Sequence, residues 1–171
     1  MILQIDGDDP LTDTGYMDLC LENLIKNNCD IAICENLPLG VASKAFTKNA
    51  IFKVKDHYIP GINDTGYMYF FTKTDLFKIH IIKPTSKFHI NNKIRLTLDY
   101  EEDLKLITTI FENLYRKNKI FGLSDVLKFV DENPNLYQIN SHLNDEYWNR
   151  TQNLMKLKYK NKTGNITSIK I

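Results

Sequence analysis

The sequence predicts an α/β fold in which a mixed, mainly parallel sheet lies between helices. Two short apolar runs, residues 2–5 and residues 31–34, each precede a polar segment and are typical of buried strands. A helical periodicity separates them, so residues 1–36 have the pattern of a strand, a helix and a parallel second strand. Because continuous apolar strands are covered on both faces, we expect helices on each side of the sheet.

The first helix follows the turn after residue 5. Thr12 or Asp13 can cap it, and apolar residues recur at helical spacing until Asn27: Met17, Cys20, Leu21, Leu24 and Ile25. After a loop through residues 37–40, Ser43 can cap a second helix that carries Ala45, Phe46, Ala50, Ile51 and Val54. Residues 56–64 are expected to form a loop.

Alternating patterns predict two further strands, over residues 77–81 and 94–99. The second strand places Arg95, Thr97 and Asp99 on one face. An apolar stripe then predicts a helix through residue 114, and Ser124 begins another helix that Pro134 ends. After residue 149 the sequence is compatible with a late strand or with a loosely held extension.

Length and composition indicate an ordinary globular protein. The 171 residues suit one domain, and 43% hydrophobic with 25% charged residues exclude a disordered or collagen-like chain. A net charge of +1 is too small to drive binding to nucleic acid or to an anionic membrane surface, so we expect neither partner. The absence of a long apolar run and of CxxC spacing among the three cysteines favours a reducing, cytoplasmic location.

Charge is unevenly distributed along the chain. Residues 1–36 hold eight acids and one lysine, whereas the last sixteen residues hold five lysines and no acid. We expect the basic end to be solvated. The chain is divided into a main unit, residues 1–143, and a basic C-terminal extension, residues 144–171.

The acidic residues supply the candidate catalytic site. Asp6, Asp8 and Asp9 surround Gly7 directly after the first strand, where α/β sheets bind ligands, and crowded carboxylates favour a hard cation such as Mg²⁺. A polar turn would explain the same residues. Asp99 also follows a predicted strand, although with Glu102 it could instead form the capping box of the next helix.

Two blocks of the chain resemble the cytidylyltransferases that activate acidic and other unusual sugars, especially the spore coat polysaccharide and acylneuraminate type. Residues 2–11 are similar to that family's strand-GD-x-PL segment, and residues 95–104 resemble its RLT-x-D-T-P-E-D-L stretch. The loop from Asn36 to Gly40 and the segment 124–140 resemble the family more weakly. Ala42 and Lys44 stand where the family often has acids.

The resemblance implies a nucleotide-diphospho-sugar transferase fold, which is Rossmann-like, and transfer of CMP from CTP to an acidic or unusual sugar with release of pyrophosphate. It implies that Asp8 and Asp99 are catalytic and hold Mg²⁺. It also implies that Asn36, Gly40, Arg95 and Thr97 are substrate-binding positions.

The family's nucleotide-binding loop, of the form R-x-x-S-x-R-x-P-x-K, has no counterpart in the chain. The resemblance therefore covers the family's carboxyl-terminal portion only, and we expect the chain alone to bind CTP poorly. A missing N-terminal half or a second copy in a homodimer is the expected partner. The alternative function is a non-catalytic remnant of the fold that acts as a partner-binding module.

Overall fold

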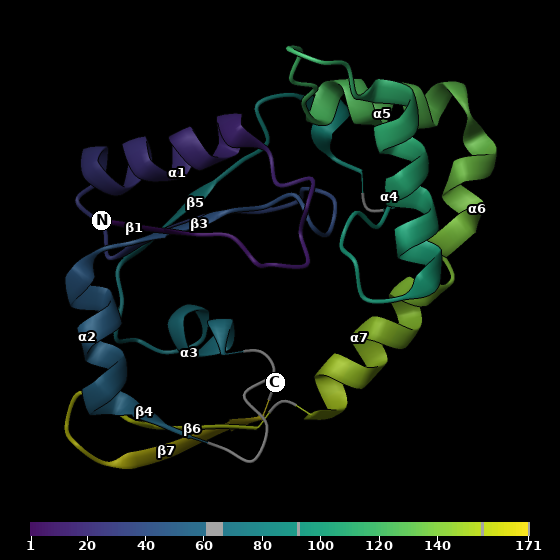
Figure 1. Ribbon diagram of the computed structural model, residues 1–171. Helices are drawn as coiled ribbons and strands as arrows, with labels where there is room; N and C mark the ends of the chain where they lie inside the picture. Colours follow the sequence, from purple (N-terminus) through teal and green to yellow (C-terminus); the bar gives the residue numbers. More distant parts are fainter. Residues whose placement is uncertain (61–66, 92, 155, 171) are drawn as a thin grey trace.

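The computed structural model describes residues 1–60, 67–91, 93–154 and 156–170. Its larger sheet has the strand order β1-β3-β2-β5, with β1 (Ile2–Gln4), β2 (Ile31–Cys34), β3 (Lys44–Phe46) and β5 (Ile79–Ile82) (Figure 1). β3 is antiparallel to both of its neighbours, and β2 is parallel to β5. β1, β2 and β5 thus run in the same direction, which confirms the predicted mixed α/β sheet.

One face of this sheet is covered by α1 (Thr14–Lys26). Asp13 caps the helix as predicted, because its carboxylate accepts a hydrogen bond from Tyr16 N at 3.2 Å. Cys20 and Leu24 are buried on the sheet side of the helix. They pack in a cluster with Cys29, Ala32, Ala45 and Ile82.

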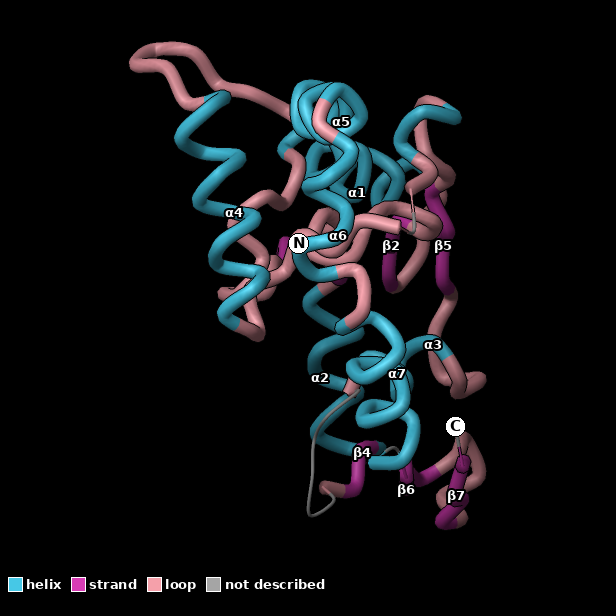
Figure 2. The backbone as a smooth tube through the Cα atoms, turned by 90° about the vertical axis from the view of Figure 1, so that its right-hand side faces the viewer, coloured by secondary structure: helices cyan, strands magenta, loops and turns pink. Residues whose placement is uncertain are grey.

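The other face is covered by α2 (Lys48–His57), by α3 (Met68–Thr72) and by a small antiparallel sheet of β4 (Tyr58–Ile59), β6 (Lys156–Lys160) and β7 (Ile166–Lys170). Figures 1 and 2 both place this sheet below α2 and α3. Leu157 and Tyr159 of β6 join a buried cluster with Phe70 and Phe71. The basic C-terminal segment is therefore part of the core, and the expectation that it is solvated was wrong.

A group of helices stands beside the sheet (Figure 1). It consists of α4 (Glu101–Leu114), α5 (Leu123–Glu132), α6 (Tyr137–Asn140) and the 3₁₀ turns η1 (Lys87–His89) and η2 (Pro134–Leu136). Their apolar faces meet in one cluster that includes Leu106, Ile110, Val126, Leu127 and Val130. The helix α7 (Leu143–Leu154) leads from this group toward the small sheet (Figures 1 and 2).

Several predicted elements differ in the structure. The helix expected from Ser43 is instead β3 followed by α2, which Thr47 caps, because Ala45 and Phe46 lie between β1 and β2 and are buried there. The loop expected over residues 56–64 contains β4, and its residues 61–64 lie outside the described residues. β1 is an edge strand with Ile2 at 42% and Leu3 at 36% exposure, so it is not buried as its apolar run suggested.

The segment over residues 94–99 is extended but joins neither sheet as a strand. Leu96 N donates to Leu39 O at 2.8 Å, and Leu98 N donates to Asp8 O at 2.8 Å. These two bonds connect the segment to the loop after β2 and to the turn after β1. Ile94, Arg95, Leu96 and Thr97 are all buried, so the predicted alternation of buried and exposed residues is absent there.

A buried ion pair joins this extended segment to α4. Arg95 and Asp103 both have 0% exposure, and Arg95 Nε donates to Asp103 Oδ1 at 2.9 Å and to Oδ2 at 3.1 Å. Asp103 also accepts hydrogen bonds from the backbone N–H groups of Asp99 and Tyr100 and from Asn140 Nδ2. The carboxylate that caps α4 is thus Asp103, with Tyr100 at the N-cap, and not the predicted pair of Asp99 and Glu102.

We predict that Asp103→Asn lowers the free energy of unfolding by about 3 kcal/mol, because it leaves the buried Arg95 without its opposite charge. Urea denaturation measures this change. The control is Glu132→Gln, which removes the solvent-exposed pair of Lys128 and Glu132 and is expected to cost less than about 1 kcal/mol. Equal effects of the two substitutions would contradict the prediction.

Candidate functional site

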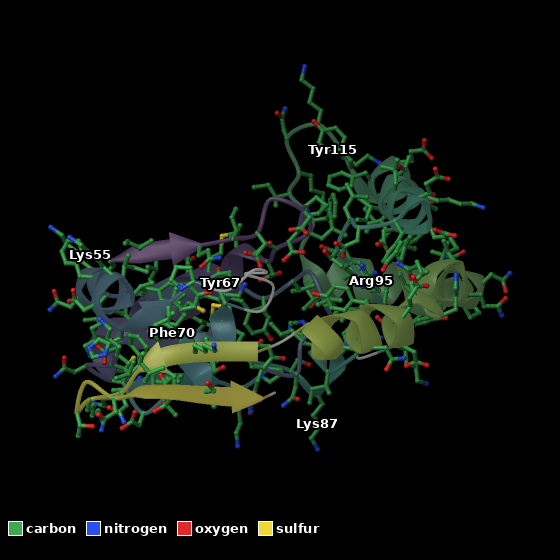
Figure 3. The ribbon with its side chains drawn as sticks, turned by 90° about the horizontal axis from the view of Figure 1, so that it is seen from below. Lys55, Tyr67, Phe70, Lys87, Arg95 and Tyr115 are labelled. Atoms are coloured by element: carbon green, nitrogen blue, oxygen red, sulfur yellow. The ribbon has the colours of Figure 1, made fainter. Side chains whose placement is uncertain are left out.

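The largest of the described cavities, with a volume of about 700 Å³, lies where the sheet, α3 and α7 meet. The loop over residues 37–42 forms one wall, and aromatic residues of α3 and α7 form the opposite one. Its lining residues are Asp6, Asp9, Leu37, Pro38, Leu39, Gly40, Ala42, Lys44, Tyr67, Met68, Tyr69, Thr72, Ile94, Asn144, Asp145, Tyr147 and Trp148. Seen from below in Figure 3, Tyr67 lies near the middle of the molecule and Arg95 lies among the helices to one side.

The two acidic segments singled out in the sequence lie side by side next to this pocket. Besides the bond from Leu98 N to Asp8 O, Thr97 Oγ1 lies 3.4 Å from the same carbonyl oxygen. The backbone of the turn after β1 is therefore held against residues 97–98. Asp8 itself is exposed, and Asp99 is half-buried.

Asp9 and Asp6 of this turn line the pocket, whereas Asp8 is not among the lining residues. The pKa of Asp9 is raised to about 6, mainly by partial burial, with a smaller contribution from the nearby carboxylates of Asp8 and Asp6. A hydrogen bond from Thr97 and the charge of Lys44 oppose the shift. The sequence placed Asp9 in the acidic turn but gave no signal that separated it from Asp8. The difference between Asp8 and Asp9 depends on which of the two carboxylates the turn directs into the pocket.

Several carboxylates near the pocket affect the pKa of Tyr147. Burial raises the pKa of this phenol, the carboxylates of Asp99, Asp8 and Asp9 raise it as well, and only the guanidinium of Arg95 lowers it. Tyr147 lines the pocket, as does Asp9, whereas Asp8 and Asp99 act on the phenol from outside the lining. Tyr147 and Trp148 are consecutive aromatic residues of α7, and both line the pocket.

Arg95 is oriented away from solvent. Its guanidinium pairs with Asp99 as well as with Asp103, and the rings of Tyr147 and Tyr100 lie 4.8 Å and 5.2 Å from it. With 0% exposure, Arg95 fixes the position of Asp99 and does not itself reach the pocket. Thr97, with 4% exposure, similarly contacts the acidic turn from inside the protein.

The predicted loop residues have different environments. Gly40 lines the pocket, has a φ of +90°, and packs so tightly that an added Cβ would lie 2.4 Å from Leu96 C and from Thr97 N. Asn36 is exposed, has a φ of +58°, and is not among the residues that line the pocket. Of the six predicted site residues, only Gly40 is among the lining residues.

The acidic edge suits a metal that needs few protein ligands. Within the described residues, no group of three or more His, Cys, Asp and Glu side chains is arranged to hold a metal ion. Mg²⁺, however, is usually held by one or two carboxylates, with water and phosphate oxygens as the other ligands. Asp8 and Asp99 supply two carboxylates, and the hydrogen bond from Leu98 N to Asp8 O joins the two segments that carry them.

Comparison with known proteins agrees with the fold. No family model matches the chain. The uncharacterized protein MJ1063 of Methanocaldococcus jannaschii is 28% identical over 161 residues, a region that covers 89% of this chain and 62% of that protein. The structure of a cytidylyltransferase from Leptospira borgpetersenii superposes with a TM-score of 0.65 at 21% identity, over 80% of this chain and 58% of that one.

These relatives establish the fold as cytidylyltransferase-like. The chain spans less than two thirds of the length of either relative. No helix in the described part of the chain combines the length and the hydrophobicity needed to cross a bilayer.

We predict that Gly40→Ala destabilises the protein by about 3 kcal/mol or more, because the methyl group would collide with backbone atoms that cannot move independently. Gly164→Ala is the matched control: Gly164 has a φ of +83° but no atom within 4 Å of an added Cβ, so only the backbone strain remains, about 1 kcal/mol. Thermal unfolding of both variants measures the difference. Equal losses would show that the close approach of Gly40 to Leu96 is unimportant.

We predict that Asp9→Asn stabilises the protein at pH 7.5 and changes its stability little at pH 4.5. A pKa raised to about 6 means that the folded state holds the Asp9 proton more tightly than the unfolded state. The wild-type protein therefore loses stability as the pH rises from about 4 to about 6, and this loss is absent in the variant. Melting temperatures across this pH range test the prediction, and a stabilisation that does not depend on pH would contradict it.

Proposed function

We propose that this chain forms the metal-binding and sugar-binding part of a nucleotidyltransferase that transfers CMP from CTP to a sugar and releases pyrophosphate. The observation that carries the proposal is the hydrogen bond from Leu98 N to Asp8 O, at 2.8 Å. It holds two acidic segments that are distant in the sequence at one edge of a pocket large enough for a sugar.

In this proposal the sugar occupies the pocket, between the loop over residues 37–42 and the aromatic wall of Tyr147 and Trp148. Asp8 and Asp99 hold Mg²⁺, and Arg95 keeps Asp99 in place through their ion pair. The bound metal neutralises charge on the triphosphate. Asn36 lies at the outer end of the loop, where it contributes to substrate binding only through the loop's conformation.

Asp9 is placed to act as the base. With a pKa of about 6 it is mostly ionised at pH 7 and can accept the proton of the attacking hydroxyl. The sugar oxygen forms a bond to the α-phosphorus of CTP, and the bond from that phosphorus to the oxygen bridging to the β-phosphate breaks. Pyrophosphate then leaves with this oxygen, and the proton remains on Asp9.

The nucleotide needs backbone N–H groups or basic side chains directed at its phosphates. Lys44 is the basic residue among the described residues that line the pocket, and Asp6 pairs with it at 2.6 Å. We therefore assign the CTP phosphates to a glycine-rich loop supplied by an N-terminal half, since a second copy of this chain carries no such loop.

The alternative, a non-catalytic partner-binding module, is favoured by one observation. β1 lies at the edge of the described sheet, and Ile2, Leu3 and Ile5 next to it are 42%, 36% and 52% exposed. An apolar edge strand of this kind pairs readily with a strand from another chain. An exposed edge strand suits a partner chain in both the nucleotidyltransferase and the partner-binding module. The two functions are therefore distinguished by an assay for CMP transfer.

We predict that Asp8→Asn lowers Mg²⁺-dependent pyrophosphate release from CTP by about a hundredfold or more, because charge stabilisation by the metal contributes several kcal/mol to such transfers. The assay uses the assembly purified from the source cells, with a panel of sugars. Asp18→Asn, an exposed carboxylate of α1, is the matched control and is expected to retain full activity.

Two results would overturn the proposal. Near-full activity of Asp8→Asn would remove the metal assignment. A wild-type assembly that shows no response to CTP and Mg²⁺ with any sugar would favour the partner-binding module.

A further inference from the structure

The pocket has an excess of negative charge. Its charged lining residues are three aspartates, Asp6, Asp9 and Asp145, and one lysine, Lys44. Lys44 Nζ lies 2.6 Å from Asp6 Oδ2, and Gln4 Nε2 donates to Asp6 Oδ1 at 2.9 Å. Among the described lining residues, the ammonium group of Lys44 is therefore already paired, and Asp9 and Asp145 have no further basic neighbour in that set.

Arg95 cannot supply a free cation to the pocket. Arg95 is fully buried, two carboxylates pair with it, and the ring of Tyr147 lies 4.8 Å from its central carbon. Tyr147 itself lines the cavity. A ligand in the pocket thus meets an aromatic ring at this point and not the positive charge behind it.

The remaining walls suit a sugar ring without a carboxylate. Tyr67, Tyr69, Tyr147 and Trp148 line the cavity, and the rings of Tyr147 and Trp148 meet edge to face with their centroids 5.2 Å apart. Aromatic rings pack against the apolar C–H faces of a sugar, whereas carboxylates accept hydrogen bonds from its hydroxyl groups or from an ammonium group. A ligand carboxylate, by contrast, would be repelled by Asp9 and Asp145.

From these observations we infer that the pocket selects a neutral or amino sugar and discriminates against acidic sugars. The inference rests on the proposed function, and it replaces the acidic sugar suggested by the resemblance with a substrate class that suits the charges of this chain. The chemistry concerned is binding only, so it can be measured without CTP and without Mg²⁺.

The test compares three sugars with a common pyranose ring: glucose, glucosamine with an amino group at C2, and glucuronate with a carboxylate at C6. Isothermal titration calorimetry or saturation-transfer NMR on the whole chain at pH 7.5 and low salt gives their affinities. We expect glucosamine to bind at least about tenfold more tightly than glucuronate, with glucose between them. The difference should shrink at 0.5 M salt, because screening weakens the interaction of charges at this partly open site.

Two variants with the same change in net charge show whether the sugar preference comes from the carboxylates of the pocket or from the net charge of the whole protein. Asp145→Asn removes a lining carboxylate and is expected to reduce the preference for glucosamine over glucuronate by about threefold or more. Asp56→Asn, an exposed residue of α2 outside the pocket lining, is the control and should leave the preference unchanged. Melting temperatures verify that both variants are folded.

Each outcome either supports or overturns the inference. Glucuronate that binds as tightly as glucosamine overturns the charge selectivity, and CMP transfer to an acidic sugar would then leave the proposed function intact. A preference for glucosamine without any CMP transfer in the native assembly supports the selectivity and removes the proposed function. If none of the three sugars binds, the cavity is not a sugar site and both conclusions fail.

Discussion

The guanidinium of Arg95 and the carboxylate of Asp103 form an ion pair from which solvent is excluded, with both residues at 0% exposure. A buried charge is tolerated only when its partners are held in position, and here the partners come from several parts of the chain. Asp103 receives the N–H groups at the start of α4 and the amide of Asn140 from α6, while Asn140 also donates to Arg95 O. The extended segment, α4 and α6 are therefore fixed relative to one another by one polar network.

That network determines where the acidic edge of the pocket lies. Because Arg95 is fixed, the extended segment can pair with Leu39 on one side and with Asp8 on the other. Arg95 also holds Asp99 at the end of the segment. Gly40 packs closely against Leu96 of this extended segment. The ion pair of Arg95 therefore also sets the position of the loop over residues 37–42, which lines the pocket.

The charges of the pocket distinguish this chain from what its family resemblance suggests. The resemblance, the superposition on a cytidylyltransferase and the pairing of the two acidic segments all agree on a nucleotidyltransferase-like scaffold. The substrate class is a separate property, because side chains that line the pocket set it and the scaffold does not. Asp9, Asp145 and Lys44, which is paired with Asp6, are among these lining side chains.

The sequence by itself determined the α/β class, the capped helix α1, the strands β2 and β5, and the helices α4 and α5, because each has a local periodicity or a cap next to it. Through two short motifs it also identified Asp8 and Asp99 as candidate metal ligands. It misassigned Ala45 and Phe46 to a helix, since a short apolar run suits a helix and a strand equally well until its neighbours are known.

Only the tertiary structure decided which carboxylate faces the pocket, which residue caps α4 and what covers the guanidinium of Arg95. Asp8 and Asp9 are adjacent in the chain, and their difference in burial comes from the contact of the turn with residues 97–98. Tyr147 and Trp148 became pocket residues because α7 passes from the helical group to the small sheet. Burial and long-range charge interactions depend on distances between segments that are far apart in sequence, and no local pattern encodes those distances.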